Sequence, residues 1–164
     1  SGADILVTSG GASVGDYDLV QKALAAEGLV LSFWKVALRP GRPMMHGRLG
    51  PMHVLGLPGN PVSSYVCAVL FLLPLIRRLA GRAEVEPRLE QATLGCDLPA
   101  NDERADYLRA ELTFREDRVV ALPAPVQDSS MLTPLAHADC LLVRAPHAPP
   151  AKAGDHCDII RLTA

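Results

Sequence analysis

Residues 4–11 read Asp-Ile-Leu-Val-Thr-Ser-Gly-Gly, a short apolar run that ends in a pair of glycines. A continuous apolar run of this length is typical of a strand in a parallel sheet, which is buried on both faces. The aspartates at positions 16 and 18 favour the first turn of a helix that runs to Glu27, and Gly28 is suited to end it. This stretch therefore predicts a strand, a glycine turn and a helix, the unit of an α/β fold.

The same organisation continues to about residue 82. Residues 29–38 and 52–57 predict two further strands. The pair Asn60-Pro61 offers a cap and a first position for a second helix, which we expect to run towards Ala80 and to end at Gly81. Residues 1–82 thus predict an α/β layer with a mostly parallel sheet.

The pattern changes after this point, because short β-type runs now alternate with turn signals. The runs cover residues 88–94, 107–114, 119–122, 140–143 and 157–162, and a helical turn is expected at 130–138. Short strands at such spacing favour sandwiches and barrels. Residues 83–164 therefore predict a second, small domain that resembles a β-barrel.

The composition excludes several classes of protein. The chain has 164 residues, of which 16 are basic and 18 acidic, so we expect no nucleic-acid partner. The four cysteines lack the spacing of a metal site, which indicates reduced thiols. The most apolar run, residues 66–76, contains Pro74 and is shorter than the roughly 20 residues that span a bilayer. We expect it to be a buried core helix, with no membrane partner.

The first residues carry two further expectations. No basic segment followed by an apolar one precedes the first strand, and we expect a cytoplasmic protein. The strand begins almost at residue 1, whereas a domain seldom opens in the middle of a sheet. We therefore expect the chain to be a fragment of a longer protein.

The loop at residues 8–18 is the first candidate site. Ligands bind at the carboxyl ends of strands in open α/β sheets, where glycines let the backbone approach an anion. The residues that would do so here are Ser9, Gly10, Gly11, Ser13 and Gly15. Asp16 and Asp18 could bind a divalent cation, or could accept hydrogen bonds from a heterocycle. The alternative is a glycine turn that only caps a helix.

Two further segments suggest the same kind of ligand. Residues 56–64 deliver a helix N-terminus with Pro58, Gly59, Asn60 and Ser63, which suits an anion, although helix initiation alone explains them equally well.

Lys35 and Arg39 are four residues apart, so strand alternation would place both on one face, with Arg42 in the next turn. Such a basic cluster suits phosphate or an oxyanion, and the alternative is a solvated face. Together the three segments predict a phosphorylated, anionic heterocycle at the carboxyl edge of the sheet.

These segments resemble the molybdopterin-binding domain of the molybdopterin molybdenumtransferases, the family that includes the gephyrin E region. The similar segments are the glycine loop at residues 9–18, the basic segment at 35–43 and Leu-Pro-Gly-Asn-Pro-Val-Ser at 57–63. Residues 104–110 and 127–132 look like parts of the family's C-terminal β-barrel domain. The resemblance covers nearly the whole chain and is weaker after residue 82.

The resemblance implies a transferase of molybdenum cofactor biosynthesis. Such an enzyme inserts molybdate into adenylylated molybdopterin and releases AMP with the help of Mg²⁺. It also implies a homodimer, and a molybdopterin adenylyltransferase as a possible partner.

Carried over residue by residue, Asp18 matches an aspartate near the pterin nucleotide, and with Asp16 it is our candidate for the metal. Lys35 and Arg39 match two active-site lysines, and Arg109 and Ser129 match two residues of the barrel domain that face the same site.

Two positions depart from the family pattern, and one region is missing. Arg39 replaces a lysine and adds a bidentate fork, and Asp128 stands where glycine is usual. The family's N-terminal domains and the first half of its molybdopterin-binding domain are absent, so we expect this chain alone to be inactive. The alternatives are a non-catalytic scaffold of the same fold, a domain similar to a molybdopterin adenylyltransferase or a nicotinamide-nucleotide amidase, and a structural fragment without activity.

Overall fold

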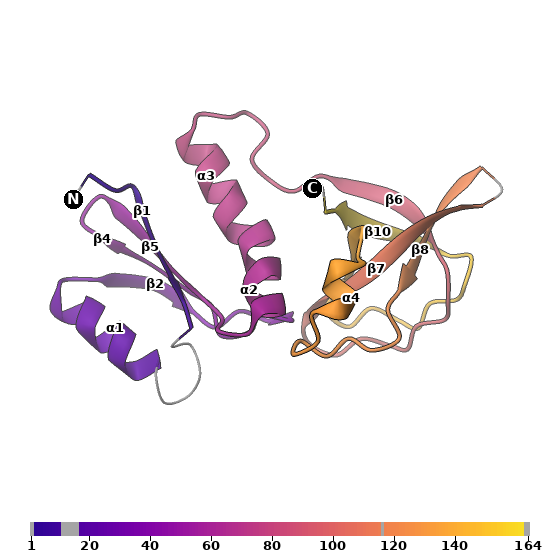
Figure 1. The fold of residues 1–164 in the computed structure, drawn as a ribbon, viewed down its shortest axis with the longest axis horizontal. Coiled ribbons are helices and arrows are strands. Elements are labelled where there is room, and N and C mark those ends of the chain that lie inside the picture. Colours follow the sequence, from indigo (N-terminus) through magenta and orange to yellow (C-terminus); the bar gives the residue numbers. More distant parts are fainter. Residues whose placement is uncertain (1, 11–16, 116, 163–164) are drawn as a thin grey trace. The chain divides into compact units, whose positions relative to one another are not determined.

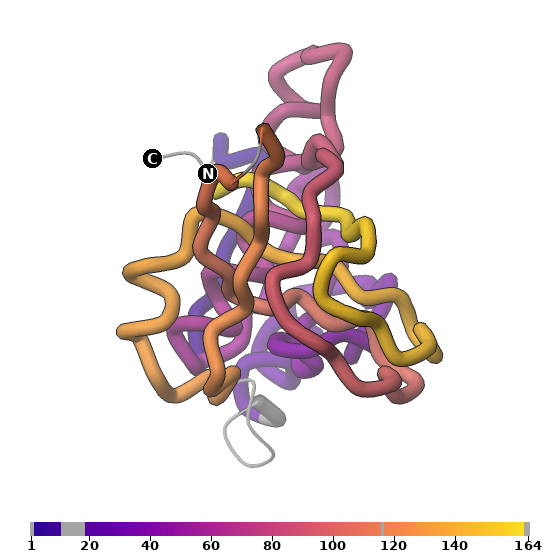
Figure 2. The backbone as a smooth tube through the Cα atoms, turned by 90° about the vertical axis from the view of Figure 1, so that its right-hand side faces the viewer, coloured from indigo at the N-terminus to yellow at the C-terminus, as the bar shows by residue number. Residues whose placement is uncertain are grey.

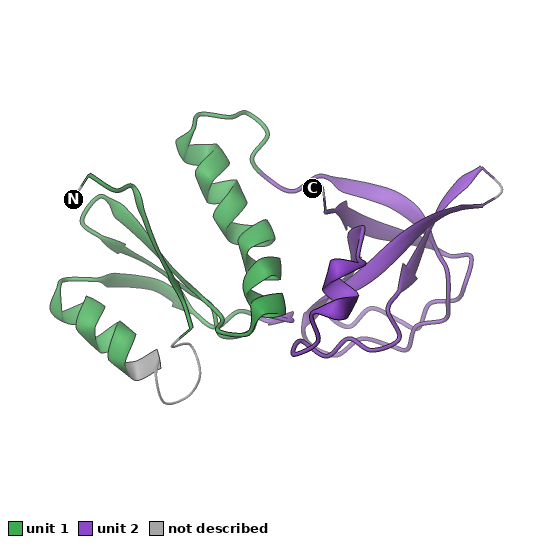
Figure 3. Ribbon diagram, in the orientation of Figure 1, with its two compact units in different colours: residues 1–36, 41–85 green, residues 37–40, 86–164 purple. Residues whose placement is uncertain are grey.

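The computed structural model describes residues 2–10, 17–115 and 117–162, and of residues 17 and 18 only their place in a helix. The chain forms two compact units (Figure 3). The first consists of residues 1–36 and 41–85, and the second of residues 37–40 and 86–164. The division of the chain into two domains at residue 82 stays a prediction. The two compact units differ from it because residues 37–40 belong to the second unit.

The first unit contains a four-stranded sheet (Figure 1). Its strands, in spatial order, are β1 (Ile5–Ser9), β5 (Met52–Leu57), β4 (Met45–Leu49) and β2 (Val30–Trp34). The predicted α/β class is confirmed. However, β1 and β5 are the one parallel pair in the described sheet, because the tight turn at Gly50, with a φ of 59°, joins β4 to β5 as an antiparallel hairpin.

Helices cover the two faces of this sheet. Leu24 of α1 (Tyr17–Ala26) packs against Met45 and Val54 on one face. On the other face, the ring of Phe33 lies 5.6 Å from that of His46 and 6.5 Å from that of Phe71, which belongs to the second helical segment. Because Met45 and His46 are consecutive on β4, the two helical layers lie on opposite sides of the sheet.

The second helical segment runs continuously through α2 (Pro61–Cys67), the π-helical turn η1 (Ala68–Leu72) and α3 (Leu73–Leu79). The π turn precedes Pro74, whose ring would clash with an ordinary α-helical turn. The helix ends as predicted at Gly81, which has a φ of 72°.

This helix has 19 residues and a mean hydropathy of 1.6, so by length and composition it could cross a membrane. That test is weak evidence, because core helices of soluble proteins pass it as well. Only 22% of the segment is buried, and all the buried residues lie in α2. The expectation of a buried core helix therefore holds only for its first part.

The second unit is a barrel. Its strands are β6 (Leu89–Leu94), β7 (Ala105–Arg115), β8 (Arg118–Pro123), β9 (Cys140–Arg144) and β10 (His156–Arg161). Neighbouring strands β7 and β8 run side by side (Figure 2), and the pairing of β7 with β9 closes the ring. Ala92, Ala110, Leu142 and Ile159 form part of its core. The predicted β-barrel and the helical turn, α4 (Thr133–Ala136), are confirmed.

The predicted strand at residues 29–38 is confirmed at Val30–Trp34 but is too long, because β2 ends at Trp34 and Lys35 has a φ of 69°. The residues Leu38–Arg39 form β3, which pairs with β7 in the other sheet. The sequence analysis also missed β4. Glycine is unfavourable in strands, so Gly47 argued against a strand at this position. In the structure it is needed there, because a Cβ atom at residue 47 would lie 2.7 Å from the carbonyl oxygen of Val30.

Candidate functional site

Three strand ends meet at one edge of the first unit's sheet. Strands β1 and β5 are parallel, and β2 runs in the same direction as β5 because both are antiparallel to β4. The carboxyl ends at Ser9, Trp34 and Leu57 therefore share one edge, and β4 starts there, just after Arg42. The two glycine loops, Lys35 and Arg42 thus lie at one edge of this sheet, as predicted, whereas Arg39 belongs to the second unit.

Two glycine loops touch at this edge. Gly10 has a φ of 85°, a conformation that favours glycine. A Cβ atom added to Gly59 would lie 3.1 Å from the Cα atom of Gly10, which is closer than nearly all real contacts. Gly10 is favoured by its φ and Gly59 by the close approach of the Gly10 backbone, so the two loops lie against each other.

The N-terminus of α2 is already capped. The Asn60 side-chain oxygen accepts hydrogen bonds from the amides of Val62 and Ser63, at 3.1 and 3.3 Å. These two amides are not free for an anion, which differs from the expectation for this segment. Ser63 and Pro58 are buried and support the loop, whereas Gly59 is exposed.

Lys35 and Arg42 are the exposed cations of this edge. The Lys35 amide donates to the carbonyl oxygen of Met44 at 2.9 Å, and the Val36 amide donates to that of Arg42 at 3.0 Å. The Lys35 Nζ atom lies 4.0 Å from the centroid of the Trp34 ring. The fold therefore fixes the backbone of both cations at the same edge of the sheet as the glycine loops, at the end of the outer strand β2.

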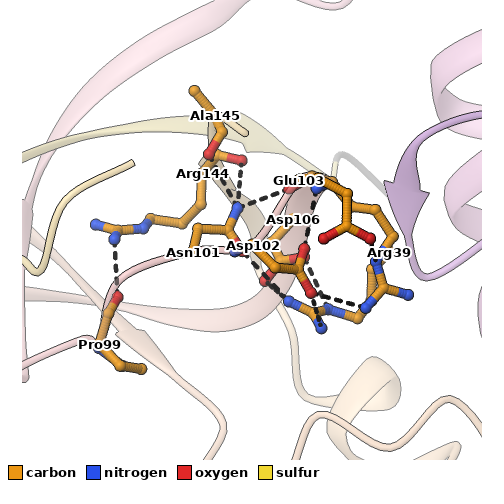
Figure 4. A network of polar contacts seen from close by, with 9 residues as sticks. Arg39, Pro99, Asn101, Asp102, Glu103, Asp106, Arg144 and Ala145 are labelled. Carbon is orange, nitrogen blue, oxygen red and sulfur yellow. Dashed lines mark hydrogen bonds and ion pairs between the residues drawn. The ribbon is translucent and has the colours of Figure 1, made fainter. Parts of the chain in front are cut away.

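Arg39 is held by two carboxylates of the second unit (Figure 4). Its guanidinium donates from Nε and Nη2 to Asp106, at 2.8 and 2.6 Å, and from Nη1 to Asp102, at 3.1 Å. The hydrogen bond to Asp106 is the main cause of a raised Arg39 pKa. The prediction that Lys35 and Arg39 share one face of a strand is wrong, because the two residues belong to different units.

Asp106 was not identified from the sequence as a functional residue. It lies just before a predicted β-type run, and only its pairing with Arg39 in the folded chain distinguishes it from the other acids nearby. The paired side chains line a pocket of about 410 Å³ in the second unit, together with Asn101, Gln127 and Arg144. Arg104 donates to Asp102 as well, and lowers the pKa of that carboxyl to about 2.

Arg109 is the buried cation of the second unit. Leu108 and Ala110 belong to the barrel core, so strand alternation places Arg109 on the outer face of β7. There its Nη2 donates to the carbonyl oxygen of Asp128 at 3.1 Å, while Nε and Nη1 are buried without a partner among the described residues. The side chain is completely buried, and this burial lowers its pKa. A buried guanidinium with two unsatisfied nitrogens is suited to accept an anion.

The segment next to Arg109 contains Asp128, whose carbonyl oxygen accepts from the Arg109 guanidinium. The Asp128 carboxylate accepts hydrogen bonds from the amide and the hydroxyl of Ser130, both at 2.8 Å. Asp128 therefore shapes this turn through its side chain. Ser129 lies half-buried in the same turn.

The structure does not test the predicted magnesium site. Gly11, Ser13, Gly15 and Asp16 lie outside the described residues, as does the side chain of Asp18. Within the described ranges, no group of three or more His, Cys, Asp or Glu side chains could hold a metal ion. Magnesium therefore stays a prediction.

Comparisons with known proteins agree with this arrangement. Residues 1–78 match the family model described as a probable molybdopterin binding domain, and residues 91–162 match the MoeA C-terminal region (domain IV). Among curated proteins, the chain is 31% identical to a molybdopterin molybdenumtransferase of Staphylococcus aureus over 157 residues, which are 96% of this chain and 38% of that protein. The corresponding protein of Haemophilus influenzae is 33% identical over 145 residues, 87% of this chain and 36% of its own length.

Solved structures show the same fold. A molybdopterin biosynthesis MoeA protein from Pyrococcus horikoshii superposes with a TM-score of 0.76 at 22% identity, and covers 98% of this chain and 38% of its own. The chain therefore spans less than half the length of these relatives. Its two matched regions place it in the molybdopterin molybdenumtransferase family, as a part that corresponds to the molybdopterin-binding and C-terminal regions.

Proposed function

We propose that this chain forms part of an enzyme that inserts molybdate into adenylylated molybdopterin and releases AMP. The observation that carries the proposal is the contact of two glycine loops at an edge with two exposed cations. Gly10 and Gly59 allow the phosphates of the pterin nucleotide to approach the backbone, and Lys35 and Arg42 supply positive charge beside them.

In this proposal the chemistry needs no covalent nucleophile. Molybdate is itself an oxyanion, and negative charge develops on the phosphoanhydride as AMP leaves. The ammonium of Lys35 and the guanidinium of Arg42 stabilise that charge from positions that the loop already fixes. Asp18 orients the edge of the pterin. Asp16 and Asp18 would hold Mg²⁺, which would supply positive charge to the phosphates.

The other predicted residues receive different roles. Arg109 binds an oxyanion in the second unit, because two of its nitrogens are buried without partners among the described residues. Arg39 is already neutralised by Asp106 and Asp102, and its main role here is to hold β3 on β7. Pro58 and Ser63 support the loop that contains Gly59 and Asn60. The native enzyme would be a cytoplasmic homodimer that receives its substrate from a molybdopterin adenylyltransferase.

The test is molybdenum insertion by the native protein that contains this chain. Lys35→Ala and Asp18→Ala are each expected to lower the rate at least tenfold while thermal unfolding stays normal. Lys152→Ala is the matched control, because it removes an exposed lysine that pairs with Asp97 at 2.8 Å. Normal insertion by both Lys35→Ala and Asp18→Ala would refute the proposed site.

A further inference from the structure

Lys35 has a backbone conformation that residues other than glycine seldom adopt. Its φ is 69°, directly after the last residue of β2. The hydrogen bond from its amide to the carbonyl oxygen of Met44 holds this conformation between two strands. Strain of this kind persists only where the surrounding structure enforces it, and it is often found at functional sites.

The turn has a direct consequence for the side chains. Consecutive residues of a regular strand point to opposite faces, so Trp34 and Lys35 would not meet if β2 continued. The left-handed conformation brings the Lys35 ammonium to 4.0 Å from the centroid of the Trp34 ring. Trp34 is the only tryptophan in a chain with 4% aromatic residues, and it is 43% exposed at the end of an edge strand.

We propose that Trp34 is a positioning residue that holds the Lys35 ammonium ready for the incoming oxyanion. The negative face of the indole ring attracts the ammonium from one side, and the N–H groups on the other side remain available to molybdate. A lysine held in this way has lost much of its rotational freedom before the substrate binds, so less binding energy is spent on ordering it. This inference rests on the proposed function of Lys35.

The test uses the native protein with Trp34→Leu and Trp34→Phe, and measures the rate of molybdenum insertion against molybdate concentration. Trp34→Leu removes the ring and is expected to raise the KM for molybdate about two- to fivefold, the factor that corresponds to an exposed cation–π contact. The KM for adenylylated molybdopterin stays unchanged, and Trp34→Phe restores most of the affinity for molybdate. Val30→Ala, at the other end of β2, is the matched control and leaves both constants unchanged.

Two results separate this inference from the proposed function. If Lys35→Ala has no effect on insertion, the function proposed for Lys35 fails. If Lys35→Ala impairs insertion but Trp34→Leu has the normal KM for molybdate, only the positioning role is refuted. It is also refuted if Trp34→Leu lowers kcat and thermal stability and Trp34→Phe does not restore the KM. In the double variant Lys35→Ala/Trp34→Leu, the effect of Trp34→Leu is expected to disappear.

Discussion

At the scale of single residues, Arg109 is expected to lower the stability of the unbound protein while it contributes to anion binding. A guanidinium that is completely buried with two nitrogens unpaired costs free energy in the unbound protein. Such an arrangement is maintained in a folded protein when a ligand supplies the missing acceptors. If Arg109 were needed only for stability, its replacement by an apolar residue would destabilise the protein.

Arg109→Met is therefore expected to stabilise the unbound chain by about 1 kcal/mol, because an apolar side chain of similar length replaces a buried unpaired charge. The same change is expected to abolish stabilisation by added molybdate. Thermal unfolding with and without molybdate measures both effects, and Arg161→Gln, which alters an exposed arginine paired with Glu90, is the control. A destabilised Arg109→Met variant that still responds to molybdate would contradict this role.

The contact between Gly10 and Gly59 predicts a second effect at the residue scale. Gly59→Ala forces two backbone segments apart and is expected to cost about 1–3 kcal/mol of stability and most of the insertion activity. Gly28→Ala is a matched control, because Gly28 has a φ of 94° but open space around it. It is expected to cost about 1 kcal/mol and to leave insertion intact. Equal activities of the two variants would show that the loop contact is unimportant.

At the scale of elements, the β4–β5 hairpin contains a chain of imidazoles. Arg48 Nη1 lies 2.8 Å from His53 Nε2, and His53 Nδ1 lies 3.1 Å from His46 Nε2. Because a guanidinium can only donate, His53 accepts at Nε2 and donates from Nδ1 to His46. Burial lowers the pKa of both histidines, and Arg48 lowers them further. The folded hairpin therefore favours the neutral forms of His46 and His53.

Both folded-state pKa values lie below the ordinary histidine value of about 6.5, so the unfolded chain binds more protons than the folded chain once the pH drops below about 6.5. The free energy of unfolding therefore decreases as the pH is lowered further. We expect the thermal midpoint of the first unit to decrease between pH 7.5 and pH 5. The double variant His46→Phe/His53→Leu is expected to flatten this dependence, whereas His137→Gln in the second unit leaves it unchanged. An unchanged slope in the double variant would contradict the lowered pKa values of the two histidines.

The sequence predicted most elements, for physical reasons that can be named. The apolar run of β1 and the Asn60 cap of α2 are local signals, and both elements were predicted correctly, although β1 is a partly exposed edge strand and not a buried one. The end of β2 was not, because nothing local shows that Lys35 takes a left-handed conformation and that β3 pairs with β7. The partner of Arg39 was missed for the same reason, since Asp106 is 67 residues away along the chain.

At the scale of the whole molecule, the chain consists of two units that interleave in sequence. The barrel closes through β7 and β9, and β3 adds to its outside. The described residues of its main core cluster come from the second half of the chain, and β3 adds only the buried Leu38. The barrel should therefore not need β3 in order to fold.

We expect residues 86–164 alone to unfold cooperatively on heating, with the circular dichroism of a β protein. Asp106→Asn removes the partner of Arg39 and is expected to cost about 1–2 kcal/mol in the full chain, because Arg39 is half-exposed. The same change should cost little in the shorter chain, which lacks Arg39. A shorter chain that does not fold, or an equal cost in both chains, would contradict this description of the barrel.

The central claim concerns the reaction, and its most direct test is the stoichiometry of AMP and molybdenum. Adenylylated molybdopterin and molybdate are supplied to the native protein that contains this chain, and free AMP and pterin-bound molybdenum are measured together. The account predicts that AMP appears only with molybdate, without any requirement for ATP, and that one AMP is released for each molybdenum inserted. AMP release that does not depend on molybdate, or adenylylation of molybdopterin by ATP, would contradict it.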